Sequence, residues 1–562
     1  MVADAAGRVM IRPRVVRRAT RSRRSPARRR PGRLNWVAIG VVLLVAAALR
    51  LAAVDRLSPH PDEPASILAA RMVAERGVPV LPSGVLYLHG ATLSYLLAPF
   101  VWSGAGDLAD LATMRVLSAA MGAGAVLMIS LLARRMSGLA WVGILAGWLL
   151  AIDPPSVQWS GHVRMYALLQ CLTIAVAWMF WRAVSDSPRR APLVWLVVFF
   201  WLATATHIGA ATLWPPLVAL AFWVHGRRLW RQRRGLTVAL GLAGLAPLVV
   251  TLLGDLIRPT DYRQSVDARL LGFAGTSLFD VGRIQEPSLS AWLALSGEGW
   301  GAGFRSLLIA AASGFVIGRH LLADHVTSRR RTALLTLLAL YWGPVLAVSL
   351  LTFEQRSRYL LHVQPFGVIL IALALTAITN SARSRRRGSW LTEGGMALGV
   401  VTLAVLVSAT GLSDRFQHPV IAPDYVTAMQ HVAAGRQPGD PVIVALPAAA
   451  YLAIDDQTEI VFLAGTEGQA RVTRYTFLTG TGSTVDYWTG STAITSPGQL
   501  CQLVQDQPGA WIVVDENRLA AGWAYRGEMA RTIDRLTRQA GEAPGGVVIL
   551  RPLPGDELPS CG

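Results

Sequence analysis

Apolar runs of nearly 20 residues recur along most of this chain, separated by short polar segments. A helix needs about 20 apolar residues to cross the hydrocarbon core of a membrane. The pattern therefore predicts a polytopic α-helical membrane protein with about eleven spans. The predicted spans are residues 34–54, 112–133, 139–152, 166–184, 191–206, 208–225, 236–254, 304–322, 333–351, 363–380 and 394–412.

Arginine clusters between the runs indicate how the spans are oriented. They fall on one side of the predicted membrane, at Arg134–Arg135, Arg189–Arg190, Arg227–Arg234, Arg329–Arg331 and Arg383–Arg387. Cytoplasmic loops are enriched in Arg and Lys, so we expect this side to be cytoplasmic. The basic segment 1–33 then reads as a disordered cytoplasmic arm near anionic lipid. The outer side receives loops 55–111, 153–165, 255–303 and 352–362, the turn at His207, and everything after residue 413.

Two segments outside the spans carry predictions of their own. Leu86–Trp102 is apolar but short, and we expect a helix along the outer surface; a further span would upset the alternation of arginine clusters. Residues 413–562 are more polar, and their apolar runs are shorter. They predict a soluble α/β domain of ordinary size, with strands at 441–447, 459–463, 510–515 and 546–550 and helices at 425–434 and 527–540.

Composition supports the membrane assignment and excludes one other class. Apolar residues make up 53% of the chain and charged residues 15%, against about 25% charged in soluble domains. The net charge of +19 does not indicate nucleic-acid binding, because the positive charge comes in short arginine clusters between apolar runs. Three cysteines do not make a disulfide framework. Cys501 and Cys561 can pair if their domain faces an oxidising compartment, whereas Cys171 lies in a span.

The outer loops hold the candidate chemistry. Asp62 and Glu63 directly follow the first span, and His89 lies further along the same loop. A carboxylate pair at the membrane surface is a candidate catalytic base. The alternatives are a helix cap or a solvated loop, because Asp and Pro are common where a helix ends. His89 has a structural surface role as its alternative.

Arginines also occur in the outer loops, against the charge bias. The second outer loop contains Asp153, Arg164 and Tyr166, and the late loop contains Arg356, Arg358, Tyr359 and His362. An anionic ligand would account for these arginines, since the guanidinium fork binds phosphate and stays charged. The alternatives are local. Arg164 can snorkel beside an interfacial Tyr166, the late arginines can pair with Glu354, and Asp153 can be a turn residue before two prolines.

These residues, in this order, resemble a known family. The acidic pair after the first span, the segment Leu93–Phe100, Met114–Ser118, Asp153–Tyr166 and Arg358–Pro365 are similar to the polytopic glycosyltransferases of the GT-C fold. The resemblance is to the family 39-like group, which includes protein O-mannosyltransferases and the aminoarabinose transferases of lipid A. It covers about residues 35–380.

The resemblance implies a function. Such enzymes transfer a sugar, usually with inversion, from a polyprenyl-phosphate donor to a protein, lipid or glycan acceptor on the outer face of the cell membrane. Asp62 would be the general base toward the acceptor hydroxyl, and Glu63 would orient Asp62, the acceptor or a cation. Arg164, Arg356, Arg358 and His89 would bind the donor phosphate. Asp153, Tyr166, Tyr359 and His362 are further candidates for the site.

The chain departs from the family in two places. The oligosaccharyltransferase branch carries an acid-x-acid metal motif in the second outer loop, where this chain has Asp153 alone, so a divalent cation remains an open alternative. Residues 413–562 do not match the acceptor-binding domains of protein O-mannosyltransferases. In this domain Asp515–Arg518 follows a predicted strand, and strand ends often bind ligands in α/β sheets.

Other functions remain as alternatives. A transporter or flippase for lipid-linked glycans would keep ionisable residues inside its spans, and few are seen here. A non-catalytic envelope-assembly scaffold could keep the same fold; the acidic pair argues against it, although a pseudoenzyme can retain such acids by chance. A polymerase or ligase acting on a lipid-linked glycan is a third alternative.

Overall fold

The computed structural model describes residues 33–185, 190–226, 228–257, 302–321, 328–351, 357–384, 422–454, 457–464, 476–520, 525 and 527–561. The predicted arm 1–33 and span 394–412 lie outside these ranges except for Arg33, and so do Arg356, the domain boundary at 413 and almost all of the loop 255–303.

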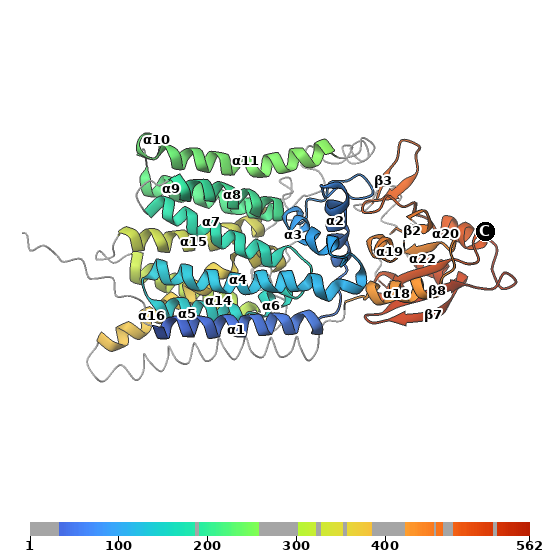
Figure 1. The fold of residues 1–562 in the computed structure, drawn as a ribbon, viewed down its shortest axis with the longest axis horizontal. Coiled ribbons are helices and arrows are strands. Elements are labelled where there is room, and N and C mark those ends of the chain that lie inside the picture. The colour runs from blue at the N-terminus through green and yellow to red at the C-terminus, as the bar shows by residue number, and fades with distance from the viewer. Residues whose placement is uncertain are drawn as a thin grey trace, which may run out of the picture.

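Long helices lie side by side in one bundle, which fills the left part of Figure 1. Their apolar side chains form a buried core. These helices are α1 (Arg33–Arg56), α4 (Leu111–Ser137), α5 (Ala140–Ala151), α7 (Tyr166–Ser185), α8 (Arg190–Thr206), α9 (Trp214–His225), α11 (Arg234–Ile257), α14 (Ala302–Val316), α15 (Ser328–Leu351) and α16 (Gln364–Ser384). Short helical segments connect them: α6 (Pro154–Ser160), η2 (Ile208–Leu213), α10 (Arg228–Gln232), η3 (Ile317–Leu321) and η4 (Ser357–Val363).

Within the described ranges, fewer helices are long and apolar enough to cross a membrane than the sequence predicted there. In the described ranges, seven helices are long and apolar enough to cross a membrane, and an eighth is counted if the bent pair α5–α6 forms one span. The two helices of that pair meet at 63°, because Pro154 and Pro155 cannot continue α5 and instead begin α6. Helices α8 and α14 are shorter apolar helices. The protein is a multi-pass membrane protein, as predicted.

The first outer loop folds into a small helical layer at one end of the bundle. It contains α2 (Glu63–Arg76), α3 (Ala91–Trp102) and η1 (Leu108–Asp110). Helix α3 packs against α2 and α8. It begins later than the predicted helix Leu86–Trp102, because Leu86 forms a β-bridge with Val80 instead.

The C-terminal region forms the predicted α/β domain, at the right of Figure 1. Its main sheet has the order β5-β2-β1-β6-β8-β7. Strands β5, β2, β1 and β6 are parallel to one another, and β8 is antiparallel to both of its neighbours, β6 and β7. Strands β3 and β4 form a separate antiparallel pair. The strands are β1 (Val442–Val444), β2 (Ile460–Leu463), β3 (Thr476–Leu478), β4 (Thr484–Asp486), β5 (Ala493–Ile494), β6 (Trp511–Asp515), β7 (Thr537–Ala543) and β8 (Val547–Pro552). The helical segments are α18 (Tyr425–Gly435), α19 (Pro447–Ala453), η5 (Gln457–Glu459), α20 (Pro497–Asp506), α21 (Glu516–Ala520) and α22 (Gly527–Leu536).

One predicted helix of this domain is wrong at its end. The sequence predicted a helix over 527–540, but α22 ends at Leu536 and the chain continues as β7. Strand β7 pairs with β8 along its length, so tertiary pairing overrides the local helical preference. Cys501 and Cys561 form a disulfide, which joins α20 to the end of the chain.

The α/β domain is mounted on the first outer loop. Helix α19 packs against α2 and η1, and apolar residues of both parts belong to one continuous buried core. Two hydrogen bonds add to this contact: Ser83 Oγ donates to the Tyr487 carbonyl, and the Ala422 amide donates to Ser58 Oγ over 3.2 Å. Helix α2, which begins at the acidic pair, is therefore held from both sides.

Candidate active site

Asp62 is at the N-cap position of α2, but its carboxylate does not cap the helix. The side chain accepts no hydrogen bond from the first turn of α2, and Pro64 near the helix start supplies a pre-set φ instead. The carboxylate is 43% exposed. The helix-cap alternative for Asp62 is therefore wrong, and its oxygens are available for other partners.

Two arginines from distant loops converge on Asp62. Arg164 Nη2 lies 3.3 Å from Asp62 Oδ2, and Arg358 Nη1 lies 3.9 Å from the same oxygen. Burial raises the pKa of the Asp62 carboxyl, but Arg164, His60 and Arg358 outweigh it and lower that pKa to about 2. Asp62 is therefore ionised throughout the physiological range.

Arg164 is held in place by several acceptors. Its Nη1 donates to the Asp62 carbonyl over 3.0 Å, to Ser66 Oγ over 3.2 Å and to the Tyr87 hydroxyl over 3.3 Å. The side chain is only 6% exposed. Arg164 is thus anchored to the outer loops and does not snorkel to the membrane surface, the alternative that the sequence left open.

Unlike Asp62, Glu63 is buried, and both of its carboxylate oxygens accept hydrogen bonds. It is fully buried and makes a two-point ion pair with Arg115, at 2.9 Å (Nε to Oε1) and 2.7 Å (Nη2 to Oε2). It also accepts the backbone amides of His60 and Val163, each over 2.7 Å. Burial raises the pKa of the Glu63 carboxyl, but His162 and Arg115 outweigh this effect and hold that pKa well below its usual range. Glu63 thus ties the start of α2 to the second outer loop.

Aromatic rings form a wall around the late-loop arginine. The Arg358 guanidinium lies 5.9 Å from the Trp159 ring and 5.6 Å from the Tyr359 ring. Tyr166 packs edge-on to Trp159 at 4.7 Å, and its ring is 6.0 Å from that of His207. Cations over aromatic faces are stabilised by the ring quadrupole. Arg358 is therefore positioned by two rings while its Nη1 faces Asp62.

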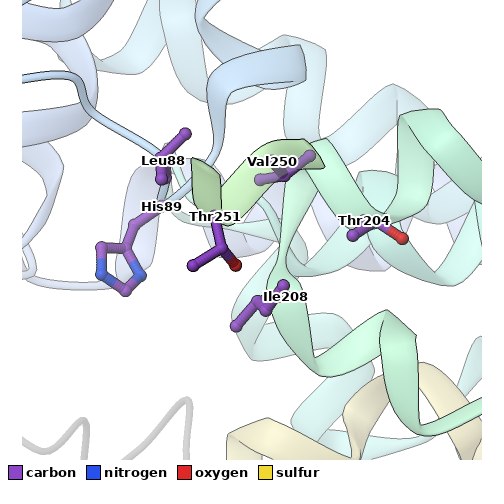
Figure 2. A pocket seen from close by; sticks show the side chains of 6 residues that line it. All are labelled: Leu88, His89, Thr204, Ile208, Val250 and Thr251. Atoms are coloured by element: carbon purple, nitrogen blue, oxygen red, sulfur yellow. The ribbon is translucent and has the colours of Figure 1, made fainter. Parts of the chain in front are cut away.

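The other predicted residues lie in different surroundings. His89 lines a small pocket between the first outer loop, the α8–η2 turn and α11, together with Leu88, Thr204, Ile208, Val250 and Thr251 (Figure 2). Asp153 Oδ2 accepts the Ser156 amide over 3.0 Å, so Asp153 is the N-cap of α6. His362 is buried, with its carbonyl accepting from Thr173 Oγ1.

Several side chains at this site were missed from the sequence. Arg115 supports Glu63, and its Nη1 also donates to the Val54 and Leu57 carbonyls at the end of α1. His162 Nδ1 lies 3.4 Å from Glu63 Oε2, and the His60 ring is 5.3 Å from Trp159. A signal for Arg115 was present, because an arginine inside a predicted span is a functional candidate by default. His60, Trp159 and His162 belong to the outer-loop segments already singled out.

The described residues contain no group of three or more His, Cys, Asp or Glu side chains arranged to hold a metal ion. Near the site, the Glu63 carboxylate is taken by Arg115 and two amides, and Asp62 faces two cations. Among the described residues near Asp62, oxygen ligands of the kind a divalent cation needs are thus not gathered.

The fold is shared, at low sequence identity, with the solved structures of ArnT and of the archaeal oligosaccharyltransferase AglB. ArnT from Cupriavidus metallidurans, in a crystal structure with undecaprenyl phosphate bound, superposes with a TM-score of 0.59 and 15% identity, covering 92% of this chain and 97% of that one. The oligosaccharyltransferase AglB from Archaeoglobus fulgidus, in complex with an inhibitory peptide and a dolichol-phosphate, gives a TM-score of 0.56 with 13% identity, over 93% and 74%. No protein-family model and no curated protein sequence matches the chain.

Proposed function

We propose that this protein is an inverting glycosyltransferase that acts at the outer face of the cell membrane. It would move a sugar from a polyprenyl-phosphate donor to an acceptor hydroxyl, with Asp62 as general base. The observation that carries the proposal is the half-exposed Asp62 carboxylate between Arg164 and Arg358. One base and two fixed cations are the groups that such a transfer needs, because phosphate leaves with little protonation. ArnT with undecaprenyl phosphate and AglB with a dolichol-phosphate share this fold.

The same arrangement suggests how the base becomes active. Without a donor, Asp62 is the anion that Arg164 and Arg358 face, and its pKa of about 2 makes it a weak base. A donor phosphate near these arginines would form ion pairs with them and so weaken their interaction with the Asp62 carboxylate. The pKa of Asp62 then rises, which makes it a better proton acceptor when the sugar is present. The arginines in turn stabilise the charge that develops on the leaving phosphate.

Glu63 and Arg115 support this site from behind. We propose that Glu63 is a positioning residue, since its oxygens already accept from Arg115, His60 and Val163. The proposed orientation follows the arginine clusters: the N-terminus is cytoplasmic, and Asp62, the outer loops and the α/β domain are extracytoplasmic in the cell membrane. The α/β domain adjoins α2, where an acceptor would approach Asp62.

The test is a transfer assay with the purified protein. It is incubated with undecaprenyl phosphate carrying mannose, glucose, galactose or arabinose, with a solubilised envelope fraction as the source of acceptor. We expect one donor to be consumed by the wild type, and Asp62→Asn to lower the rate by at least about 10²-fold while still binding undecaprenyl phosphate.

Arg71→Gln is the matched control, because Arg71 pairs with Glu75 on the outer part of α2, away from the site. Full transfer activity in Asp62→Asn would remove Asp62 as base. Consumption of no donor by the wild type would instead favour the flippase or scaffold alternative.

A further inference from the structure

His207 lies beside the proposed site, at the turn between α8 and η2. Its side chain is 3% exposed. Its ring is 6.0 Å from that of Tyr166 and 5.9 Å from that of Tyr359, between the second and the late outer loop. The residues on either side of this turn, Thr204 and Ile208, line the pocket shown in Figure 2. His207 is thus a buried imidazole near two tyrosine rings, and residues close to it in the chain line the pocket.

The protonation of this imidazole is fixed by its surroundings. Nδ1 accepts the Gly209 amide over 3.0 Å, so it carries no proton. Burial, with His89, His362 and the nearby arginines, lowers the pKa of His207 well below its usual value. The ring is therefore neutral, with its proton on Nε2.

The Nε2–H group donates no hydrogen bond within the described residues. Gly209 accounts for Nδ1, and in the described part of the chain nothing accepts a hydrogen bond from Nε2. A donor on a side chain that is only 3% exposed can find its acceptor on a bound ligand.

The chemistry around His207 indicates which part of a donor it would meet. The phosphate has two permanent cations available, Arg164 and Arg358. A neutral N–H donor close to two tyrosine rings suits a sugar instead, because sugar hydroxyls accept hydrogen bonds and sugar C–H faces pack on aromatic rings.

We propose that His207 Nε2–H binds a hydroxyl of the transferred sugar and so helps to determine which sugar this protein accepts. The inference rests on the proposed glycosyltransferase function. It assigns His207 to sugar specificity, separately from the phosphate contacts and from the base Asp62.

Two variants separate this role from a structural one. His207→Asn keeps an acceptor near the Nδ1 position for Gly209 but has no donor at Nε2. His207→Gln puts an amide N–H near Nε2. Both are assayed with the undecaprenyl-phosphate sugar that the wild type consumes and with its 2-, 3- and 4-deoxy analogues.

We expect the wild type to favour the parent sugar over one deoxy analogue by about tenfold in kcat/KM, the size of one hydrogen bond. In His207→Asn this ratio falls to about one, while the ratios for the other analogues are unchanged. In His207→Gln part of the ratio returns. The affinity for undecaprenyl phosphate without a sugar stays within about twofold in both variants.

Three results would overturn the inference. If His207→Asn keeps every wild-type ratio, the residue is only a cap of η2. If it weakens undecaprenyl phosphate alone as much as the loaded donor, His207 contacts phosphate. In both cases the proposed transferase function stands. If the wild type consumes no donor, both proposals fail together. Should His207→Asn unfold at a lower temperature than the wild type, the same comparison is made with His207→Gln, which must then retain part of the ratio.

Discussion

At the scale of the residue, two adjacent carboxylates have opposite surroundings. Glu63 is enclosed by Arg115 and two backbone amides, whereas Asp62 is half-exposed and faces Arg164 and Arg358. Breaking a buried ion pair on one side leaves an uncompensated charge and costs about 3–5 kcal/mol. Glu63 therefore stabilises the site, and Asp62 keeps a carboxylate free to react.

A pH prediction follows for Asp62. Because Arg164 helps to lower the pKa of this carboxyl to about 2, the base stays ionised as pH falls to about 4. We expect kcat/KM of the wild type to show no acid limb above pH 4. Arg164→Gln should raise the pKa toward the ordinary value of about 3.9, move the limb into the measurable range and weaken donor binding.

The measurement is a pH–rate profile of the wild type and of Arg164→Gln from about pH 3 to 8 with the consumed donor, so that a limb near pH 3.9 falls within the range. The acid limb of kcat should lie at a higher pH than that of kcat/KM, because the bound phosphate interacts with the two arginines and so raises the pKa of Asp62. An Arg164→Gln profile that overlays the wild type, at unchanged donor affinity, would contradict the role given to Arg164.

At the scale of the element, the second outer loop is positioned by a helix break. Asp153 caps α6, and the prolines after it set the first turn of that helix. The loop then lies directly on α1: a Cβ on Gly161 would be 2.9 Å from the Ala53 Cβ and 2.8 Å from a methyl of Leu57. This close approach brings His162 and Arg164 to the start of α2.

The cap gives an element-scale prediction. Asp153→Ala should lower the free energy of unfolding by about 1 kcal/mol, measured by denaturant titration in detergent. Asp153→Asn keeps a capping oxygen and should stay close to the wild type. An equal loss in Asp153→Asn would mean that the charge of Asp153, and not its cap, is what stabilises this segment.

At the scale of the whole molecule, the membrane bundle and the α/β domain share one buried core through α2 and α19. The disulfide Cys501–Cys561 lies elsewhere, between α20 and the chain end. It constrains the outer domain without touching the described site.

Removing the disulfide tests this separation. The double variant Cys501→Ser with Cys561→Ser should destabilise the α/β domain by about 2–4 kcal/mol, seen as a lower unfolding temperature. Transfer activity at 25 °C should be retained while the domain is folded. Wild-type protein treated with reductant should behave in the same way; a selective loss of activity at full stability would link the disulfide to the site.

Several features were determined by the sequence itself. Lengths of apolar runs are local, so they indicated a polytopic fold, and ten of the eleven predicted ranges contain helices; the eleventh lies outside the described residues. Period and composition indicated the α/β domain, and loop position singled out Asp62, Arg164 and Arg358, which lie together in the structure.

Other features were decided only by the tertiary structure. Whether a carboxylate is free or enclosed depends on partners about 50 to 100 residues away, such as Arg115 and Val163 for Glu63. The strand after α22 exists because β8 pairs with it. His207 became a candidate only when its neighbours Tyr166 and Tyr359 and its bond to Gly209 were seen. Local patterns report what a segment can form, whereas burial and long-range contacts determine what each side chain does.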